Sequence, residues 1–151
     1  MARMHSRAAL LLLTVVVGCS SSGSSGEPLD GPVMRYTTSP SEDVAAAEVK
    51  GRLELDGECL YIALDEVGER FPIVWPTGTT WDPEDQAVIG SEGTRRAVGS
   101  QVYGGGGYSK VEEVERLLGA DAKALAVSCV DNTYGEVAFV NNQSGAIGPV
   151  E

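Results

Sequence analysis

The sequence predicts a mainly β domain with one helix, folded as a small antiparallel β-barrel or a sandwich and joined by one disulfide. Three observations indicate this fold. Short alternating segments recur between turn signals over residues 45–142, which is typical of small barrels and sandwiches. One helical pattern follows a glycine run late in this region. Two cysteines, Cys59 and Cys129, lie far apart within it.

The region opens with a predicted β-hairpin. In residues 49–56, VKGRLELD, apolar residues and glycine alternate with charged residues, which is the period of a strand with one wet face. Asp56-Gly57 then supplies a turn. The alternation resumes in residues 59–65, CLYIALD, so the two segments are expected to pair as neighbouring antiparallel strands.

Three further strands are expected in the middle of the domain. They are RFPIVWP (70–76), QAVIG (86–90) and TRRAVGSQVYG (94–104), separated by turn residues. Pro72 and Pro76 lack a backbone N–H, so the first of these segments is expected at an edge or a bulge.

The predicted helix covers residues 109–118. Ser109 and Glu112 form an S-x-x-E capping box at its start, and Gly119 is placed to close its end. Its apolar stripe is expected to pack on the sheet; the stripe consists of Val111, Val114, Leu117 and Leu118.

A second hairpin is expected after the helix. In residues 123–130, KALAVSCV, the side chains of Leu125, Val127 and Cys129 would share one face of a strand. Asp131-Asn132 would turn the chain into residues 135–141, GEVAFVN. With this hairpin, the sequence predicts about seven strands and one helix.

The N-terminus has the pattern of an export signal. Residues 1–7 carry Arg3 and Arg7 and no acid, and residues 8–18 are almost entirely apolar. A bilayer-spanning helix needs roughly 20 apolar residues, so this run is too short for a permanent span. Residues 1–18 are therefore predicted to be a signal peptide.

Val16-Val17-Gly18-Cys19 resembles the lipobox of bacterial lipoproteins. That resemblance implies cleavage before Cys19, lipid on its thiol, and anchoring at the extracytoplasmic face of the cell membrane or envelope. More than one acyl chain (palmitate, for example) would hold the protein stably, because a single chain binds only marginally. The alternative is an ordinary cleaved signal with an incidental cysteine. Residues 19–44, rich in Ser, Gly and Pro, are expected to form a flexible tether, with a short strand at residues 33–36 as an alternative within it. Residues 143–151 are expected to form a C-terminal tail.

Loss of residues 1–18 limits the chemistry of the mature chain. It removes His5, the one histidine, and leaves nine basic and 22 acidic residues, a formal charge of −13. Nucleic acid is not an expected partner, because binding to a polyanion depends on Lys and Arg. Ser-His-Asp, Cys-His and histidine-based zinc sites cannot form in one mature chain. We expect no catalytic residues, no metal and no cofactor.

Cys59 and Cys129 then remain as an even pair in an exported, oxidised protein, which predicts a disulfide. Two separate buried thiols are the alternative, since spacing alone does not bring two sulfurs together.

The domain resembles a small, partly open barrel of the OB type. The segments LDGECLYI, FPIVWPTGTTWD and GSQVYGGGGY also resemble a recurring pattern in small secreted and lipid-anchored bacterial proteins of unassigned activity. The resemblance implies a fold more than an activity.

The candidate binding residues are aromatic and acidic. Residues 75–86, WPTGTTWDPEDQ, combine tryptophans with carboxylates, which suits a sugar, a cationic ligand or, less well, calcium. Two tyrosines lie near if the strands curl. Alternatively, the first tryptophan lies in the core and the acids lie in water. The candidates are Trp75, Trp81, Asp82, Glu84, Asp85, Tyr103 and Tyr108.

The glycine run at 104–107 precedes the predicted helix, where backbone N–H groups attract anions. It lacks the spacing of a P-loop or a dinucleotide-binding turn, so a structural loop is the favoured interpretation.

Two functions follow from these features. The first is a lipid-anchored, non-enzymatic binding or accessory module of the cell envelope, whose partner is an envelope protein or a small ligand. The second is a small carboxylate-dependent hydrolase or carbohydrate-active enzyme that uses the acids at 82–85.

Overall fold

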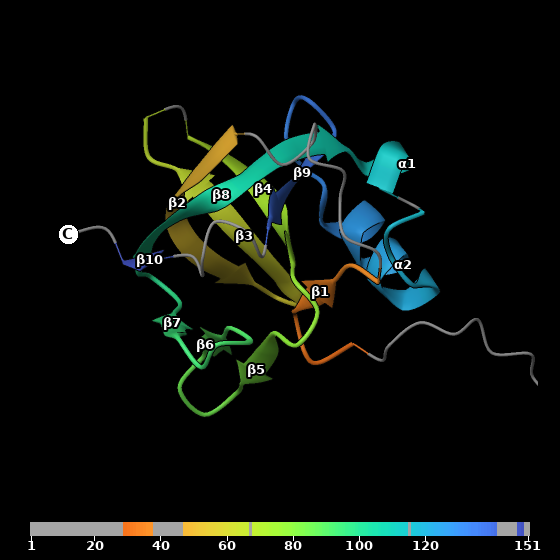
Figure 1. Cartoon of the computed structure of the whole chain (residues 1–151). Coiled ribbons are helices and arrows are strands. Elements are labelled where there is room, and N and C mark those ends of the chain that lie inside the picture. The colour runs from red at the N-terminus through yellow and green to blue at the C-terminus, as the bar shows by residue number, and fades with distance from the viewer. Residues whose placement is uncertain (1–28, 38–46, 67, 115, 142–147, 150–151) are drawn as a thin grey trace, which may run out of the picture.

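Five strands close a β-barrel in the computed structural model, which describes residues 29–37, 47–66, 68–114, 116–141 and 148–149 (Figure 1). The strands are β2 (Ala47–Asp56), β3 (Cys59–Leu64), β4 (Glu69–Trp75), β8 (Gln101–Lys110) and β9 (Glu136–Val140). Around the barrel the order is β2-β3-β4-β9-β8, with β4 and β9 parallel and every other neighbouring pair antiparallel. The predicted mainly β fold and small barrel are confirmed.

The first hairpin forms as predicted. Strands β2 and β3 pair from Arg52–Ala63 to Asp56–Cys59, and Gly57 turns the chain with a φ of 61°. Along β2, Val49 and Leu53 are fully buried, while the charged residues between them face outward. The period of two therefore reports the inner and outer faces of the barrel wall.

Strands β4 and β9 are covered on both faces, which explains their continuous apolar runs. Ile73 and Ala138 pair across the two strands and face the barrel interior. Val74 and Phe139, the next pair, face a second core under the helices. Pro72 is not on an edge strand, because β4 pairs with β3 through this residue and begins to pair with β9 at Ile73.

The glycine run at 104–107 lies inside strand β8 and is not a loop. Strand β8 pairs with β2 on one side and with β9 on the other. A Cβ atom on Gly106 would lie 1.7 Å from the carbonyl oxygen of Phe139 and 2.9 Å from Cγ2 of Val49. The absence of side chains lets the strands of a small barrel approach this closely.

Two helices replace the predicted single helix and the strand after it. Helix α1 covers only Val111–Val114, and Ser109 belongs to β8. The Ser109 hydroxyl bonds the Glu113 carboxylate at 2.7 Å, so the predicted capping box is wrong. Gly119 stands at the start of α2 (Ala120–Cys129) and not at the end of the first helix.

The strand predicted at 123–130 is wrong for a physical reason. The segment ADAKALAVSC is too short for its apolar period to distinguish a helix from a strand. It is rich in alanine, the strongest helix former, and this helix propensity determines its secondary structure. Val127, expected to face inward, is 55% exposed. Only the second half of the predicted hairpin is a strand, β9, and its partners are β4 and β8.

Residues 29–37 lie within the predicted tether, but they pack on the barrel. We call this segment the strap. It contains β1 (Met34–Arg35), which pairs in parallel with β4 at Val74 and Trp75. Val33 and Met34 are fully buried, so apolar contacts hold the strap in place. In the predicted tail, β10 (Gly148–Pro149) pairs with β8.

A separate three-stranded sheet forms between β4 and β8 along the chain. It consists of β5 (Thr80–Asp82), β6 (Ala87–Ile89) and β7 (Arg95–Ala97), and it lies beyond one end of the barrel (Figure 1). Val88 of β6 is buried in the same core as the barrel interior, so the small sheet is packed against the barrel. None of the helices in the described part of the chain is long and apolar enough to span a membrane.

The predicted disulfide is confirmed. Cys59 at the start of β3 is bonded to Cys129 at the end of α2, 70 residues later, with a Cα–Cα distance of 5.6 Å. The bond joins the first barrel hairpin to the helical segment. The signal residues, His5 and Cys19 lie outside the described residues.

Candidate functional site

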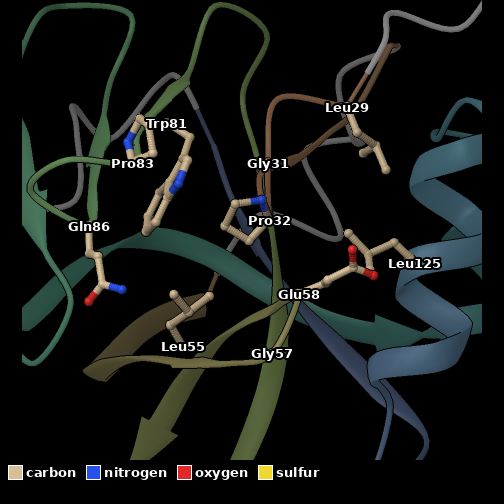
Figure 2. Close-up of a pocket in the computed structure, with 10 residues that line it drawn as sticks. All are labelled: Leu29, Gly31, Pro32, Leu55, Gly57, Glu58, Trp81, Pro83, Gln86 and Leu125. Carbon is tan, nitrogen blue, oxygen red and sulfur yellow. The ribbon is translucent and has the colours of Figure 1, made fainter.

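A pocket of about 460 Å³ lies where the strap, the β2–β3 turn, the small sheet and α2 meet (Figure 2). We call it the Trp81 pocket. Its walls come from four segments that are distant in sequence, and most of its side chains are apolar. The lining residues are Leu29, Gly31, Pro32, Leu55, Gly57, Glu58, Trp81, Pro83, Gln86 and Leu125.

The strap positions Trp81. The Asp30 carboxylate accepts a hydrogen bond from the Trp81 backbone N–H at 2.8 Å. Gly31 has a φ of 58°, and a Cβ atom there would lie 2.7 Å from Cδ1 of the indole. Position 31 therefore requires glycine, both for its backbone conformation and for the close contact with the Trp81 ring. Arg35 adds a hydrogen bond from Nη1 to the Thr79 carbonyl at 2.9 Å.

The opposite wall is held by the disulfide. Glu58 directly precedes Cys59, and Leu125 lies one helical turn before Cys129. The bond thus fixes the β2–β3 turn relative to α2. In Figure 2 the Glu58 carboxylate lies near Leu125, Pro32 lies between these two residues and Trp81, and Leu55 lies below the indole. Glu58 has no ion-pair or hydrogen-bond partner among the described residues.

Hydrogen bonds and ion pairs also hold the end of α2 against the barrel. The Tyr61 hydroxyl donates to the Cys129 carbonyl at 3.0 Å. The Arg70 guanidinium lies 4.1 Å from the centre of the Tyr61 ring and pairs with Asp131 at 2.6 Å and with Asp56 at 3.0 Å. Its hydrogen bond to Asp131 raises the pKa of Arg70. The side chains of Tyr61 and Arg70 therefore stabilise the fold.

Two of the three acids at 82–85, Asp82 and Asp85, are held by backbone N–H groups of the loop and by Arg95 of β7. One Asp82 oxygen accepts the backbone N–H groups of Glu84 and Asp85 at 2.9 and 3.2 Å, while Arg95 donates to the other at 2.6 Å. Arg95 also pairs with Asp85. The hydrogen bond from Arg95 lowers the pKa of Asp82, so this carboxyl is ionised at neutral pH and is a poor proton donor.

The other predicted binding residues lie apart from one another. Trp75 is 3% exposed and belongs to the barrel core. Tyr103 is exposed on β8, and Tyr108 packs edge-on against Phe71 with ring centres 4.8 Å apart. Burial raises the pKa of the Tyr108 hydroxyl. Of the seven candidates, only Trp81 lines the pocket, with Asp82 next to it in sequence.

Sequence reasoning missed most of the pocket. Glu58, Gln86 and Leu125 come from a turn, a small sheet and a helix that the sequence places far apart. One signal was available, because pairing Cys59 with Cys129 brings their sequence neighbours together. Gln86 gave no such signal, although it is the one described non-glycine residue with a positive φ, 46°.

The site is not arranged for metal binding. Among the described residues, no group of three or more His, Cys, Asp and Glu side chains is placed to hold a metal ion.

Comparison with protein-family models, curated proteins and solved structures finds no match for this chain. Fold and site together define a small, disulfide-bonded β-barrel protein with an open, mainly apolar pocket beside the barrel end.

Proposed function

We propose that this chain is a lipid-anchored, extracytoplasmic binding module of the cell envelope, without enzymatic activity, and that it binds a small ligand in the Trp81 pocket. The observation that carries the proposal is the pocket itself. Its volume of about 460 Å³ falls in the range of small-molecule sites. Six of its lining side chains are apolar, and only Glu58 and Gln86 are polar, which is the usual composition of such sites.

The proposed anchor places the pocket near a membrane. The lipobox-like sequence ends at Cys19, and Leu29 on the pocket wall follows ten residues later. Ten residues of polypeptide span at most about 36 Å even when fully extended. A ligand bound beside the strap would therefore be held close to the membrane surface.

The chemistry of the acidic loop does not favour the hydrolase alternative. A carboxylate-pair mechanism needs one protonated acid and a second ionised acid across a cleft. Asp82 and Asp85 share Arg95 instead, and neither lines the pocket. Loss of turnover of an envelope substrate in Asp82→Asn or Asp85→Asn, with the fold intact, would contradict the binding proposal.

The anchor is tested by changing its cysteine. We expect Cys19→Ser to shift the protein from the detergent phase to the aqueous phase in Triton X-114 partitioning, or to leave its signal uncleaved, because the lipid acceptor is gone. The mass of the wild-type N-terminal peptide should include the acyl groups. Unchanged detergent partitioning of the variant would rule out this anchor.

The pocket is tested by NMR on the ¹⁵N-labelled soluble domain, starting at Ser20. Its two tryptophan indole N–H signals separate the pocket from the core, because Trp81 lines the pocket and Trp75 is buried elsewhere. In a fragment screen, we expect binders to shift the Trp81 signal and leave the Trp75 signal in place. Trp81→Ala lacks the indole reporter, so binding is followed there at the backbone amides of Glu58 and Gln86, whose ligand-induced shifts should disappear. Tyr103→Ala, which removes an exposed aromatic outside the pocket, should keep these shifts. A screen without any Trp81 shift would refute binding at this site.

A further inference from the structure

The charge of the Trp81 pocket comes from a single side chain. Glu58 is the only ionisable residue among those that line it, and no described residue pairs with its carboxylate. Asp30, nearby on the strap, directs its carboxylate to the Trp81 backbone N–H. No lysine or arginine lines the pocket. The local potential is therefore negative, and the net charge of the mature chain adds to it.

The opposite side of the pocket offers an aromatic surface. The Trp81 indole extends toward Leu55, across the pocket from Glu58 (Figure 2). The face of a tryptophan ring attracts cations more strongly than that of any other side chain. A carboxylate on one side of the pocket and an indole on the other, with Pro32 between them, suit a molecule that is positively charged at one end and apolar elsewhere.

Gln86 adds a polar group on the small-sheet side of the pocket. Its backbone has a positive φ of 46°, and its carbonyl accepts the Val98 N–H at 2.9 Å. A non-glycine residue in this conformation carries a modest backbone strain. Its amide side chain can both donate and accept hydrogen bonds, so it can serve an uncharged polar group on the ligand.

We propose that the Trp81 pocket selects a small organic cation: a protonated or quaternary amine on an apolar body, with its charge at Glu58 and its apolar body extending past Pro32 toward the Trp81 ring. This inference rests on the proposed binding function and deepens it. An anionic ligand would meet an unpaired carboxylate of like charge. A neutral ligand would cover that carboxylate without replacing the water that solvates it, which costs free energy. A cation avoids both penalties.

The test uses three probes with nearly the same skeleton: 4-phenylbutylamine, 4-phenylbutan-1-ol and 4-phenylbutanoate, which are a cation, a neutral molecule and an anion at pH 7. Affinities come from the shift of the Trp81 indole N–H signal. We expect the amine to bind about tenfold more tightly than the alcohol, as a charge-assisted hydrogen bond allows, and the carboxylate most weakly. Added salt should weaken binding of the amine and leave that of the alcohol unchanged.

Two variants assign the selectivity to the pocket. Glu58→Gln keeps the size of an exposed side chain and should lower the affinity for the amine about tenfold while sparing the alcohol. Glu48→Gln removes the same charge near the other end of β2 and should change neither. The two positions are ten residues apart, and seven residues of strand from Glu48 to Leu55 span about 23 Å.

The outcomes separate the two proposals. Equal binding of amine and alcohol, or an unchanged ratio in Glu58→Gln, would overturn cation selectivity and leave the pocket as a binding site. The same holds if the alcohol or the carboxylate binds best. If no probe moves the Trp81 signal, the inference fails, and a blank result in the wider fragment screen would remove the binding function with it.

Discussion

The close approach of three barrel strands requires glycine at position 106. Its missing Cβ atom would overlap the Phe139 carbonyl of β9 and contact Val49 of β2, so the glycine lies where two strands close on a third. Backbone atoms cannot move aside in a closed sheet as a flexible side chain can. In sequence, the same run had two interpretations, an anion site or a structural loop, and the structure places it in a strand instead. The contacts of Gly106 account for one of its glycines by packing alone.

We expect Gly106→Ala to lower the free energy of unfolding by at least about 3 kcal/mol, because the new methyl group has no space. Gly57→Ala is the matched control. It has a φ of 61° and nothing within 4 Å of its Cβ position, so it should cost only about 1 kcal/mol of backbone strain. Urea denaturation under oxidising conditions measures both. Similar losses in the two variants would contradict the steric explanation.

Trp81 was predicted as a binding residue together with Trp75, and the structure separates the two. The alternative interpretation, with Trp75 in the core, is the correct one. The difference is positional: Trp75 ends a barrel strand and points inward, whereas Trp81 lies in β5 of the small sheet, where the Asp30 carboxylate of the strap accepts its backbone N–H. A sequence pattern identifies the strands, but not which side of an added sheet remains open.

Among the strands and helices, those with strong local sequence signals were predicted correctly. The first hairpin, with its regular alternation and its Asp56-Gly57 turn, is confirmed, although β2 begins two residues earlier than predicted, at Ala47. Helix α2 was missed, because alternating Leu, Val and Cys in an alanine-rich segment fit both periods over so few residues. Within the predicted tether, the alternative of a short strand at residues 33–36 is the correct one, but the packing of residues 29–37 was not predicted, because their burial depends on tertiary contacts with β4.

The disulfide has two roles as a connection between elements. It closes a loop of 70 residues, and it fixes the turn bearing Glu58 to the helix bearing Leu125. Because both residues line the pocket, a loss of the bond should affect the pocket as well as the overall stability. Helix α2 would remain attached through Tyr61 and Arg70.

We expect the double variant Cys59→Ser/Cys129→Ser to lose about 4 kcal/mol of stability, the loop-closure value for this separation. Reduction of the wild type should give the same shift in the urea midpoint. In the native state, amide exchange should increase at Gly57, Glu58 and the end of α2 and remain unchanged in β8. Equal stability of oxidised and reduced protein would show that the bond contributes nothing.

The whole molecule depends on how the barrel closes. Strand β9 lies between β4 and β8 and contributes to both cores, with Ala138 and Val140 inside the barrel and Val137 and Phe139 under the helices. Without it, two strands would have unpaired edges and both cores would be open. Strand β10, in contrast, pairs with β8 over two residues only.

We therefore expect a chain that stops after Asp131 to lose cooperative thermal unfolding, although it keeps both cysteines and all other barrel strands. A chain that stops after Gln143 lacks β10 and should melt within a few degrees of the full-length protein, because about 1 kcal/mol shifts the Tm of a domain this size by roughly 4–8 °C. Circular dichroism during heating compares the two. A cooperative transition in the shorter chain would show that β9 is dispensable.

The position of β9 also sets when this protein can fold. A chain appears from its N-terminus during synthesis, and β9 is the last of the five barrel strands along it. Until Val140 has emerged, β4 and β8 have no strand between them, so the barrel cannot close while most of the chain is already present. Closure by distant segments is intrinsically slow. Such a chain reaches its final form only after nearly all of its residues have been synthesised.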